Sequence, residues 1–473
     1  MPMEERGPGL EQMSKGGTSS VIDKYLGTPK TAKYRCKVES LQSSLHAKAK
    51  ADPSYKFYSL WDKIYRKDVL HRAYRQCKRN GGSYGVDKQT FDNIALIGEE
   101  KWLEELQEEL RKDQYVPQPL RRVWIPKGNS KSKRRPLSIA CIKDRVVQTA
   151  MHLILQPIFE ADLLPEQYGF RPDVDAKMAV RRIYYHVTQH KRTGIVDADL
   201  KDYFTSIPHK DLIKCLSRRI VDKKILSLIK QWLETPIEGF FNGKIQRSNE
   251  AKEGHRSVAQ GSPISPLLAN CYFRRFLLAW KKFGMEEQLD AKVVNYVDDF
   301  VICCSPNKVN EAMQSMKSIM ERLGLFVNEA KTRTVKAPQE SFDFLGYTFG
   351  LVYNKNNETY WGTQPSKKAV KKVIDKIHEA TRIQTTWTTA ENRVLEINQI
   401  IRGWCGYFNQ GPVLKSYRAV RKYTEKRLRR WLVKKHKMRG TTGYRQFPDE
   451  HLYGKLGLYA IAEVMADVPK AKA

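Results

Sequence analysis

The chain has 473 residues, which is long for one hydrophobic core and favours two to four subdomains. Hydrophobic residues make up 41% of the sequence, enough for a folded protein, and no apolar run is long enough to favour a membrane span. Lys and Arg number 84 against 52 Asp and Glu, a formal net charge of +32. This charge favours a polyanionic partner, and nucleic acid is preferred to an anionic membrane because the basic residues are spread along the chain.

The cysteines and the N-terminus indicate a reducing compartment. The polar N-terminus has no hydrophobic signal segment, and the cysteines form neither a Cys-x-x-Cys pair nor a cluster with zinc-ligand spacing. We therefore expect a cytoplasmic protein whose cysteines are reduced. The eight are Cys36, Cys77, Cys141, Cys215, Cys271, Cys303, Cys304 and Cys405.

The first 140 residues divide by composition and periodicity. Residues 1–55 start with Gly and Ser among scattered charges, which predicts a flexible N-terminal arm. Apolar residues at helical spacing predict helices over residues 57–79 and around residues 102–110. Residues 123–125 then indicate a strand, followed by a turn and a return strand carrying Arg135, a basic β-hairpin.

The middle of the chain alternates helices with apolar strands, which indicates an α+β fold. Strands are expected over residues 194–200, 293–296 and 300–304. The residues between the last two strands are few enough for the turn of a β-hairpin. From residue 366 to residue 439 the signals are helical and end in a dense basic run.

Three carboxylates fall at the ends of these strands. Asp298 and Asp299 alone would be interpreted as turn-forming residues, but Asp199 ends another apolar strand. If the strands are neighbours in one sheet, the three carboxylates meet at one edge and repel each other unless cations bind. We therefore predict that they hold two Mg²⁺ ions, with Mn²⁺ as a substitute, for phosphoryl transfer to a primer 3′-hydroxyl. Asp202 is expected to be solvated or structural.

The motifs around these carboxylates resemble those of reverse transcriptases. The string Tyr296-Val297-Asp298-Asp299 resembles the Tyr-x-Asp-Asp signature, and residues 199–204 resemble the first catalytic Asp motif. Four further matches follow the order of the family, at residues 125–127 with 135–137, 260–270, 328–332 and 344–347. The resemblance implies an RNA-directed DNA polymerase with a right-hand fold, in which fingers and a palm with an antiparallel sheet bind an RNA template, a DNA or RNA primer and dNTPs.

The same resemblance implies a nucleotide-binding set. A bulky Phe204 would be a steric gate that excludes a 2′-hydroxyl. Taken singly, each motif has an ordinary alternative: a solvated hairpin, a capped loop or a core Phe. The implied nucleotide-binding residues are Lys127, Arg135, Phe204, Gln260, Gly261 and Lys331.

Within that class, residues 55–460 resemble bacterial group II intron reverse transcriptases, or maturases, through residues 143–148, 168–172 and 403–408. This implies a helical thumb, or X domain. The implied domains, in chain order, are a flexible arm (1–55), an N-terminal extension (56–118), fingers (119–193), a palm (194–355), a thumb (356–445) and a C-terminal tail (446–473). The implied nucleic-acid-binding residues are Arg171, Gly346, Trp404, Arg427, Arg430 and Lys434.

The sequence departs from the family at Val297, Ala259, Thr205 and Ser138, where Ala, Pro, Asp and Gly are usual. None of these changes removes a predicted metal ligand or the gate, so activity is expected to survive. No Cys/His pattern of an HNH endonuclease occurs, and we expect no endonuclease domain. Two alternatives stay open: a host-serving DNA repair and end-joining polymerase, and a splicing maturase acting mainly by binding intron RNA. A homodimer also stays open.

Overall fold

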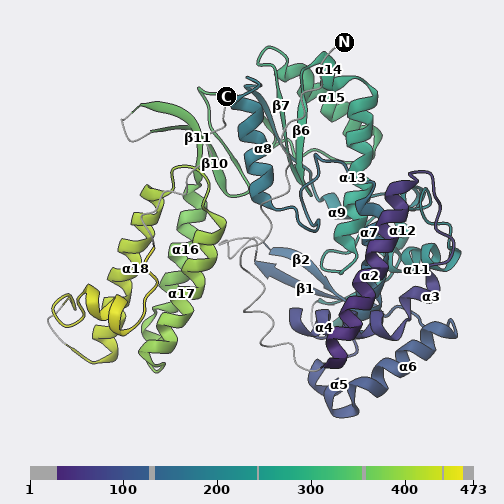
Figure 1. Ribbon diagram of the computed structural model, residues 1–473, viewed down its shortest axis with the longest axis horizontal. Helices are drawn as coiled ribbons and strands as arrows, with labels where there is room; N and C mark the ends of the chain where they lie inside the picture. Colours follow the sequence, from purple (N-terminus) through teal and green to yellow (C-terminus); the bar gives the residue numbers. More distant parts are fainter. Residues whose placement is uncertain (1–28, 127–133, 242–243, 354–357, 439–441, 462–473) are drawn as a thin grey trace, which may run out of the picture. The chain divides into compact units, whose positions relative to one another are not determined.

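The computed structural model describes residues 29–126, 134–241, 244–353, 358–438 and 442–461 (Figure 1). The chain divides into two compact units, one formed by residues up to 162 together with 209–267, the other by residues 163–208 together with those from 268 onward. Both units combine helices with sheets whose strands are mainly antiparallel, which confirms the expected α+β class.

The first unit carries a four-stranded sheet in the order β2-β1-β4-β5. Strands β1 and β2 pair antiparallel, which confirms the predicted hairpin, and β4 joins β1 in parallel. The elements are α2 (Pro29–Ala51), α3 (Trp61–Ile64), α4 (Lys67–Asn80), α5 (Phe91–Ile97), α6 (Glu99–Arg111), β1 (Leu120–Pro126), β2 (Arg134–Ile139), α7 (Ile142–Glu160), α10 (His209–Leu216), α11 (Lys223–Leu233), β4 (Ile237–Phe241), β5 (Lys244–Ser248) and α12 (Glu250–Glu253).

Helix α2 lies within the stretch predicted to be a flexible arm, so that prediction is wrong for these residues. Val38, Leu45 and Ala49 are buried along one helical stripe, and α2 packs against α4 and α7. The Gln42 amide also donates to the Leu153 carbonyl at 2.9 Å. The Gly- and Ser-rich residues before α2 dominated the composition of the segment and concealed its apolar spacing.

The second unit is built on a four-stranded antiparallel sheet in the order β6-β7-β3-β8. Helix α8 packs on β6 and β7, and α15 packs on β3, β7 and β8 (Figure 1). The elements are α8 (Ala176–Thr188), β3 (Gly194–Asp199), α9 (Tyr203–Ser206), α13 (Ser265–Lys282, which starts in the first unit), α14 (Met285–Gln288), β6 (Lys292–Tyr296), β7 (Asp299–Cys304), α15 (Val309–Arg322) and β8 (Arg333–Lys336).

A second sheet, in the order β11-β10-β9, and a group of helices complete this unit. Phe447, Leu452, Leu458 and Ile461 are buried in the same core as Trp431 of α18, so the expected tail from residue 446 is in part folded core. The elements are β9 (Phe342–Phe344), β10 (Tyr347–Tyr353), β11 (Thr359–Pro365), α16 (Lys367–Ala380), the 3₁₀ turn η2 (Ile383–Thr385), α17 (Ala390–Tyr407), α18 (Leu414–Lys435) and the π-helical turn η3 (His451–Lys455).

Candidate active site

The three residues predicted to carry the metal-binding carboxylates lie at one end of the β6-β7-β3-β8 sheet, where β3 ends and β7 begins. Strands β3 and β7 are antiparallel neighbours, and their register places Asp199 opposite Asp299. Tyr296 also pairs with Asp299, which leaves Val297 and Asp298 as the two-residue loop between β6 and β7. The neighbouring strands on which the metal prediction depended are therefore present.

The Asp199 carboxylate is held by two side chains from the segment that precedes β8. Lys331 Nζ lies 2.7 Å from its Oδ1, and Asn328 Nδ2 donates to its Oδ2 at 2.8 Å. The Asn328 backbone N–H also donates to the Asp199 carbonyl at 2.8 Å. Sequence reasoning placed Lys331 near the site but missed Asn328, which the matched string 328–332 already contained.

Asp299 shows the electrostatic cost of this arrangement. Asp299 is the exposed first residue of β7, but partial desolvation of its carboxyl raises its pKa to about 7, and the negative charges of Asp298 and Asp199 add to the rise, while Lys331 opposes it. Within β3, burial also raises the pKa of Asp197 to about 6, although Arg333 partly offsets that rise. This end of the sheet therefore carries more negative charge than its neighbours neutralise.

These carboxylates fit a magnesium ion by the chemistry of their donors. Mg²⁺ prefers hard oxygen ligands, uses few carboxylates and keeps several waters. Among the described residues, no three His, Cys, Asp or Glu side chains are already arranged around a common metal position. In this conformation each Asp199 oxygen accepts one hydrogen bond, from Lys331 or Asn328, and each keeps a lone pair that a metal ion could use.

Two adjacent aromatic residues follow Asp199 on α9, and the structure separates their environments. Tyr203 is buried, donates from its hydroxyl to the Ala269 carbonyl at 2.7 Å and packs edge-on against Phe273. Phe204 is half-buried. Tyr203 is therefore the core aromatic residue of this pair. Phe204 is partly exposed, as a side chain that acts as a steric gate against a 2′-hydroxyl must be. Asp202 is exposed and starts α9 with a φ of 49°, as expected for a structural residue.

The first unit contains the remaining predicted nucleotide contacts. Gly261 has a φ of 106°, and a Cβ there would lie 2.9 Å from both Leu137 Cδ1 and the Ser138 carbonyl oxygen, so only glycine fits. The Ser138 N–H donates to the Gln260 carbonyl at 3.0 Å, which fixes this loop on β2. Arg135 is exposed on β2, and Lys127 lies outside the described residues.

Two of the residues predicted to contact nucleic acid have hydrogen-bond partners within the chain. The Arg171 guanidinium donates to the carbonyls of Leu164 and Gln167, at 2.9 and 2.7 Å, and so closes its own loop. Arg427 donates to both the hydroxyl and the carbonyl of Thr381, at 3.0 and 2.8 Å. These guanidinium groups hold backbone in place.

The turn between β9 and β10 is bonded to helix α17. Leu345 and Gly346 have φ values of 50° and 81°, as in the tight hairpin turns in which glycine is preferred. The Tyr407 hydroxyl donates to the Leu345 carbonyl at 2.9 Å, and the Tyr347 hydroxyl donates to the Tyr407 carbonyl at 2.6 Å. Gly346 is thus fixed between sheet and helix.

Two family models and a curated relative match this chain. Residues 125–349 match the family model described as reverse transcriptase (RNA-dependent DNA polymerase), and residues 370–447 match the group II intron, maturase-specific domain. Protein YkfC from Escherichia coli (strain K12) is 34% identical over 347 residues, which cover 66% of this chain and 87% of that protein. The chain belongs to the group II intron reverse transcriptase/maturase family. It is therefore an RNA-directed DNA polymerase by family.

A second curated relative and one solved structure have lower sequence identity to this reverse transcriptase. The group II intron-encoded protein LtrA from Lactococcus lactis subsp. cremoris is 29% identical over 292 residues, which cover 60% of this chain but 44% of that protein. A solved structure of telomerase from Candida albicans with a fragment of telomeric RNA has a TM-score of 0.41 at 14% identity, covering 77% of this chain and 68% of that one. None of the described helices has the length and apolar character that a membrane crossing requires.

The maturase-specific region of this reverse transcriptase lines a groove of about 680 Å³ beside the Leu345-Gly346 turn. One wall is a row of exposed lysines on α16, Lys368, Lys372 and Lys376, spaced four residues apart so that they share one helix face. Trp404 of α17 lines the same groove, and Arg430 and Lys434 of α18 are exposed. Sequence reasoning named Trp404 but missed the lysine row, which its four-residue spacing could have indicated.

Proposed function

We propose that this reverse transcriptase adds dNTPs to a primer 3′-hydroxyl on an RNA template, with Asp199, Asp298 and Asp299 holding two Mg²⁺ ions. The pairing of β3 with β7 carries the proposal, because it sets Asp199 opposite Asp299 beside the turn that contains Asp298. Bound Mg²⁺ would supply activation of the 3′-hydroxyl and charge neutralisation of the leaving group. The test is primer extension on an RNA template by the wild type and Asp299→Asn.

The chain's own residues have separate tasks in this proposal. Lys331 balances the charge of Asp199 before metal binds and then lies free to face the phosphates of the nucleotide. Arg135 of β2 would contact the triphosphate together with Lys127, which lies outside the described residues, and the Gln260-Gly261 loop would lie beneath nucleotide and template. Residues 56–118, 119–193, 194–355 and 356–445 would serve as N-terminal extension, fingers, palm and thumb, in a bacterial cytoplasmic enzyme.

Phe204 is proposed to exclude the 2′-hydroxyl of ribonucleotides. Replacing it with Ala opens that space, and we expect rNTP incorporation relative to dNTP incorporation to rise by about 10- to 100-fold. The measurement is kcat/KM for dCTP and CTP at one template position. Tyr203→Phe is the matched control, because it removes the hydroxyl that bonds Ala269 but keeps the ring. Unchanged sugar selectivity in Phe204→Ala would mean that the gate lies elsewhere.

A second function, binding of structured RNA such as a group II intron, is favoured by the groove of the maturase-specific region. Its lysine row can follow the phosphates of a nucleic-acid backbone, while Trp404, which is buried against Phe408 and Tyr417, supports the wall of the groove. Splicing by this route would not require the carboxylates, so a splicing assay with Asp298→Ala separates it from polymerisation.

The lysine row gives a salt-dependence prediction. The triple variant Lys368→Gln, Lys372→Gln, Lys376→Gln should lower the slope of log K against log salt concentration by about 0.7 to 0.9 for each lost phosphate contact. Fluorescence anisotropy with a primer–template duplex or an intron RNA measures this slope. Lys367 and Lys371 lie on the same helix outside the groove, so their Gln variants are the control. An equal change per charge in both variants would reject the groove as the binding surface.

A further inference from the structure

Val297 holds a backbone conformation that its side chain disfavours. It is the first of the two loop residues between β6 and β7, and its φ is 64°, in the left-handed region where glycine is usual. A β-branched residue is an outlier there, and such strain persists only where the surroundings determine the conformation. Asp298 and Asp299 follow directly, so whatever holds Val297 also sets their direction.

The Asn295 side chain supplies one restraint. Its amide Nδ2 donates to the Val297 carbonyl at 2.8 Å, across the start of the turn, and Asn295 is fully buried. Asn295 is itself held by backbone bonds from a separate loop: its N–H donates to the Glu166 carbonyl at 2.8 Å, and its carbonyl accepts from the Tyr168 N–H at 2.9 Å. The turn is therefore fixed to residues 166–168.

The same loop presses against the Val297 side chain. A Cβ on Gly169 would lie 2.4 Å from Val297 Cγ2 and 3.1 Å from the Val297 nitrogen, so glycine lets the two backbones approach. The Gly169 carbonyl accepts from Asn270 Nδ2 at 2.7 Å, and the Asn270 carbonyl accepts from Gln167 Nε2 at 2.9 Å. Gln167 and Asn270 are both buried, so these bonds are shielded from water.

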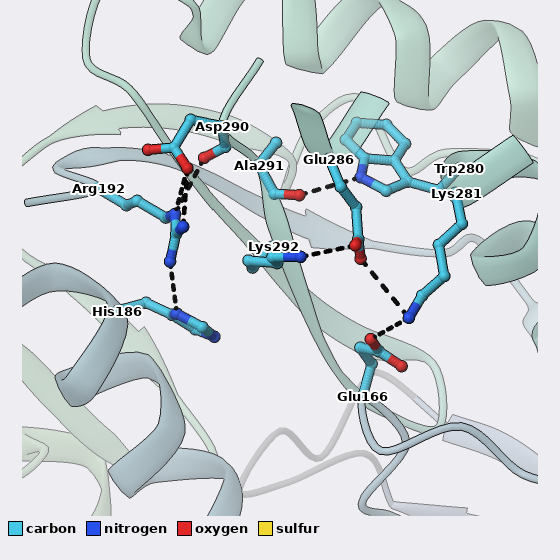
Figure 2. A network of polar contacts seen from close by, with 9 residues as sticks. All are labelled: Glu166, His186, Arg192, Trp280, Lys281, Glu286, Asp290, Ala291 and Lys292. Atoms are coloured by element: carbon cyan, nitrogen blue, oxygen red, sulfur yellow. Dashed lines mark hydrogen bonds and ion pairs between the residues drawn. The ribbon is translucent and has the colours of Figure 1, made fainter. Parts of the chain in front are cut away.

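An ion-pair network fixes both sides of this arrangement (Figure 2). Lys281 Nζ lies 2.6 Å from Glu166 Oε1 and 3.7 Å from Glu286 Oε1, and Lys292 Nζ lies 2.6 Å from Glu286 Oε2. Glu166 belongs to the loop and Lys292 starts β6, so the network joins the loop to the strand that leads into the turn. Both sides are thus tied to the end of α13.

We propose that Asn295, Gln167 and Asn270 form a turn clamp that aims the carboxylates of Asp298 and Asp299 at their metal ions. This inference rests on the proposed function, since it assigns the three amides as positioning residues for that site. General core packing would favour amides whose hydrogen-bonding groups are all satisfied, but the side-chain oxygens of Asn295 and Asn270 are buried without a hydrogen-bond partner among the described residues. Their amide donors are instead directed at the backbone of Val297 and of its contact Gly169, and Gln167 holds Asn270 through its carbonyl.

The test starts from Asn295→Ala, which leaves the Val297 carbonyl without this donor. We expect faster hydrogen exchange in a peptide spanning residues 296–299, and Mn²⁺ binding to the free enzyme, measured by electron paramagnetic resonance, weakened by about tenfold or more. A second change, Val297→Gly, removes the strain because glycine adopts this φ without cost. The double variant Asn295→Ala, Val297→Gly should therefore regain most of the Mn²⁺ affinity and slow exchange again.

The matched control is Asn398→Ala on α17. Asn398 is also buried, its Nδ2 donates to the Gly457 carbonyl at 2.8 Å and its Oδ1 accepts from the Tyr459 N–H at 2.7 Å, so this variant loses at least as much hydrogen bonding far along the chain from the turn. We expect a lower melting temperature for the control and unchanged Mn²⁺ affinity. This comparison separates positioning of the turn from general loss of stability.

The outcomes distinguish the clamp from the site it serves. Unchanged exchange at residues 296–299 in Asn295→Ala overturns the clamp whatever the metal does. The clamp is also rejected as a positioning device if Asn295→Ala exchanges faster but binds Mn²⁺ with unchanged affinity, while Asp299→Asn loses Mn²⁺ affinity. If Asp299→Asn binds Mn²⁺ like the wild type, the proposed metal site is rejected, and the exchange data still decide whether Asn295 holds the turn.

Discussion

Asp299→Asn is expected to lower the rate of primer extension on the order of 10³-fold or more, while the melting temperature of the metal-free protein stays the same or rises. The loss of activity follows because an amide is a poorer Mg²⁺ ligand than a carboxylate and carries no charge. The gain in stability follows from the surroundings of Asp299, where partial desolvation and the charges of Asp298 and Asp199 disfavour its ionised form.

This substitution should also change the pH dependence of stability. The pKa of Asp299 is raised from an ordinary 3.8 to about 7 in the folded protein, so the folded state binds the proton more tightly than the unfolded state. The contribution of this group is fully present below about pH 4 and is lost as the pH rises to about 7. Without metal, wild type should therefore lose stability across this window, and Asp299→Asn should lose less.

Primer extension and thermal unfolding in EDTA, from pH 4 to pH 8, measure both effects. Asp202→Asn is the control, because Asp202 is exposed, its side chain makes no capping bond at the start of α9, and Asn tolerates its left-handed backbone. We expect near wild-type extension from this control. Substantial extension by Asp299→Asn would contradict the assignment of Asp299 as a metal ligand.

Gly169→Ala is expected to be nearly as damaging to activity, although residue 169 belongs to no predicted site. The added Cβ would lie 2.4 Å from Val297 Cγ2, so the loop or the turn must move. Overpacking of this kind typically costs about 1–3 kcal/mol of stability. Because the displaced residue precedes Asp298, we expect the rate of extension to fall further than this loss of stability alone explains.

Val297→Ala provides the complementary change. It removes Cγ2, the atom nearest to the new Cβ, so the double variant Gly169→Ala, Val297→Ala should regain much of the activity that the single variant loses. Steady-state extension and melting temperatures of the four proteins form a double-mutant cycle. Strictly additive effects would show that the two residues do not influence each other and would remove the basis of this prediction.

The sequence was sufficient to place Asp199, Asp298 and Asp299 at the ends of strands, because their positions are local signals. Asp199, Asp298 and Asp299 interrupt apolar runs whose length and composition already predict strands, and the strand pairing then follows from few alternatives. The conformation of Val297 could not be predicted, because valine gives no local signal for a positive φ. It depends on Asn295 and on a loop more than a hundred residues earlier in the chain.

For the basic residues, the sequence does not reveal which side chains are held by the fold and which remain exposed. The resemblance at residues 168–172 implied a nucleic-acid contact for Arg171, and the basic run at the end of the helical region implied one for Arg427, Arg430 and Lys434. The fold gives Arg171 and Arg427 backbone carbonyls to hold and leaves Arg430 and Lys434 exposed. Such partners come from tertiary packing, which neither charge nor helical periodicity records.

The bonds between Tyr407 and the β9–β10 turn have a consequence for movement along a template. Since Tyr407 donates to the Leu345 carbonyl and accepts from the Tyr347 hydroxyl, α17 cannot slide without displacing that turn. The proposed RNA-binding groove and this turn would then move as one body when a bound nucleic acid advances, because any relative displacement of α17 and the turn breaks both hydrogen bonds.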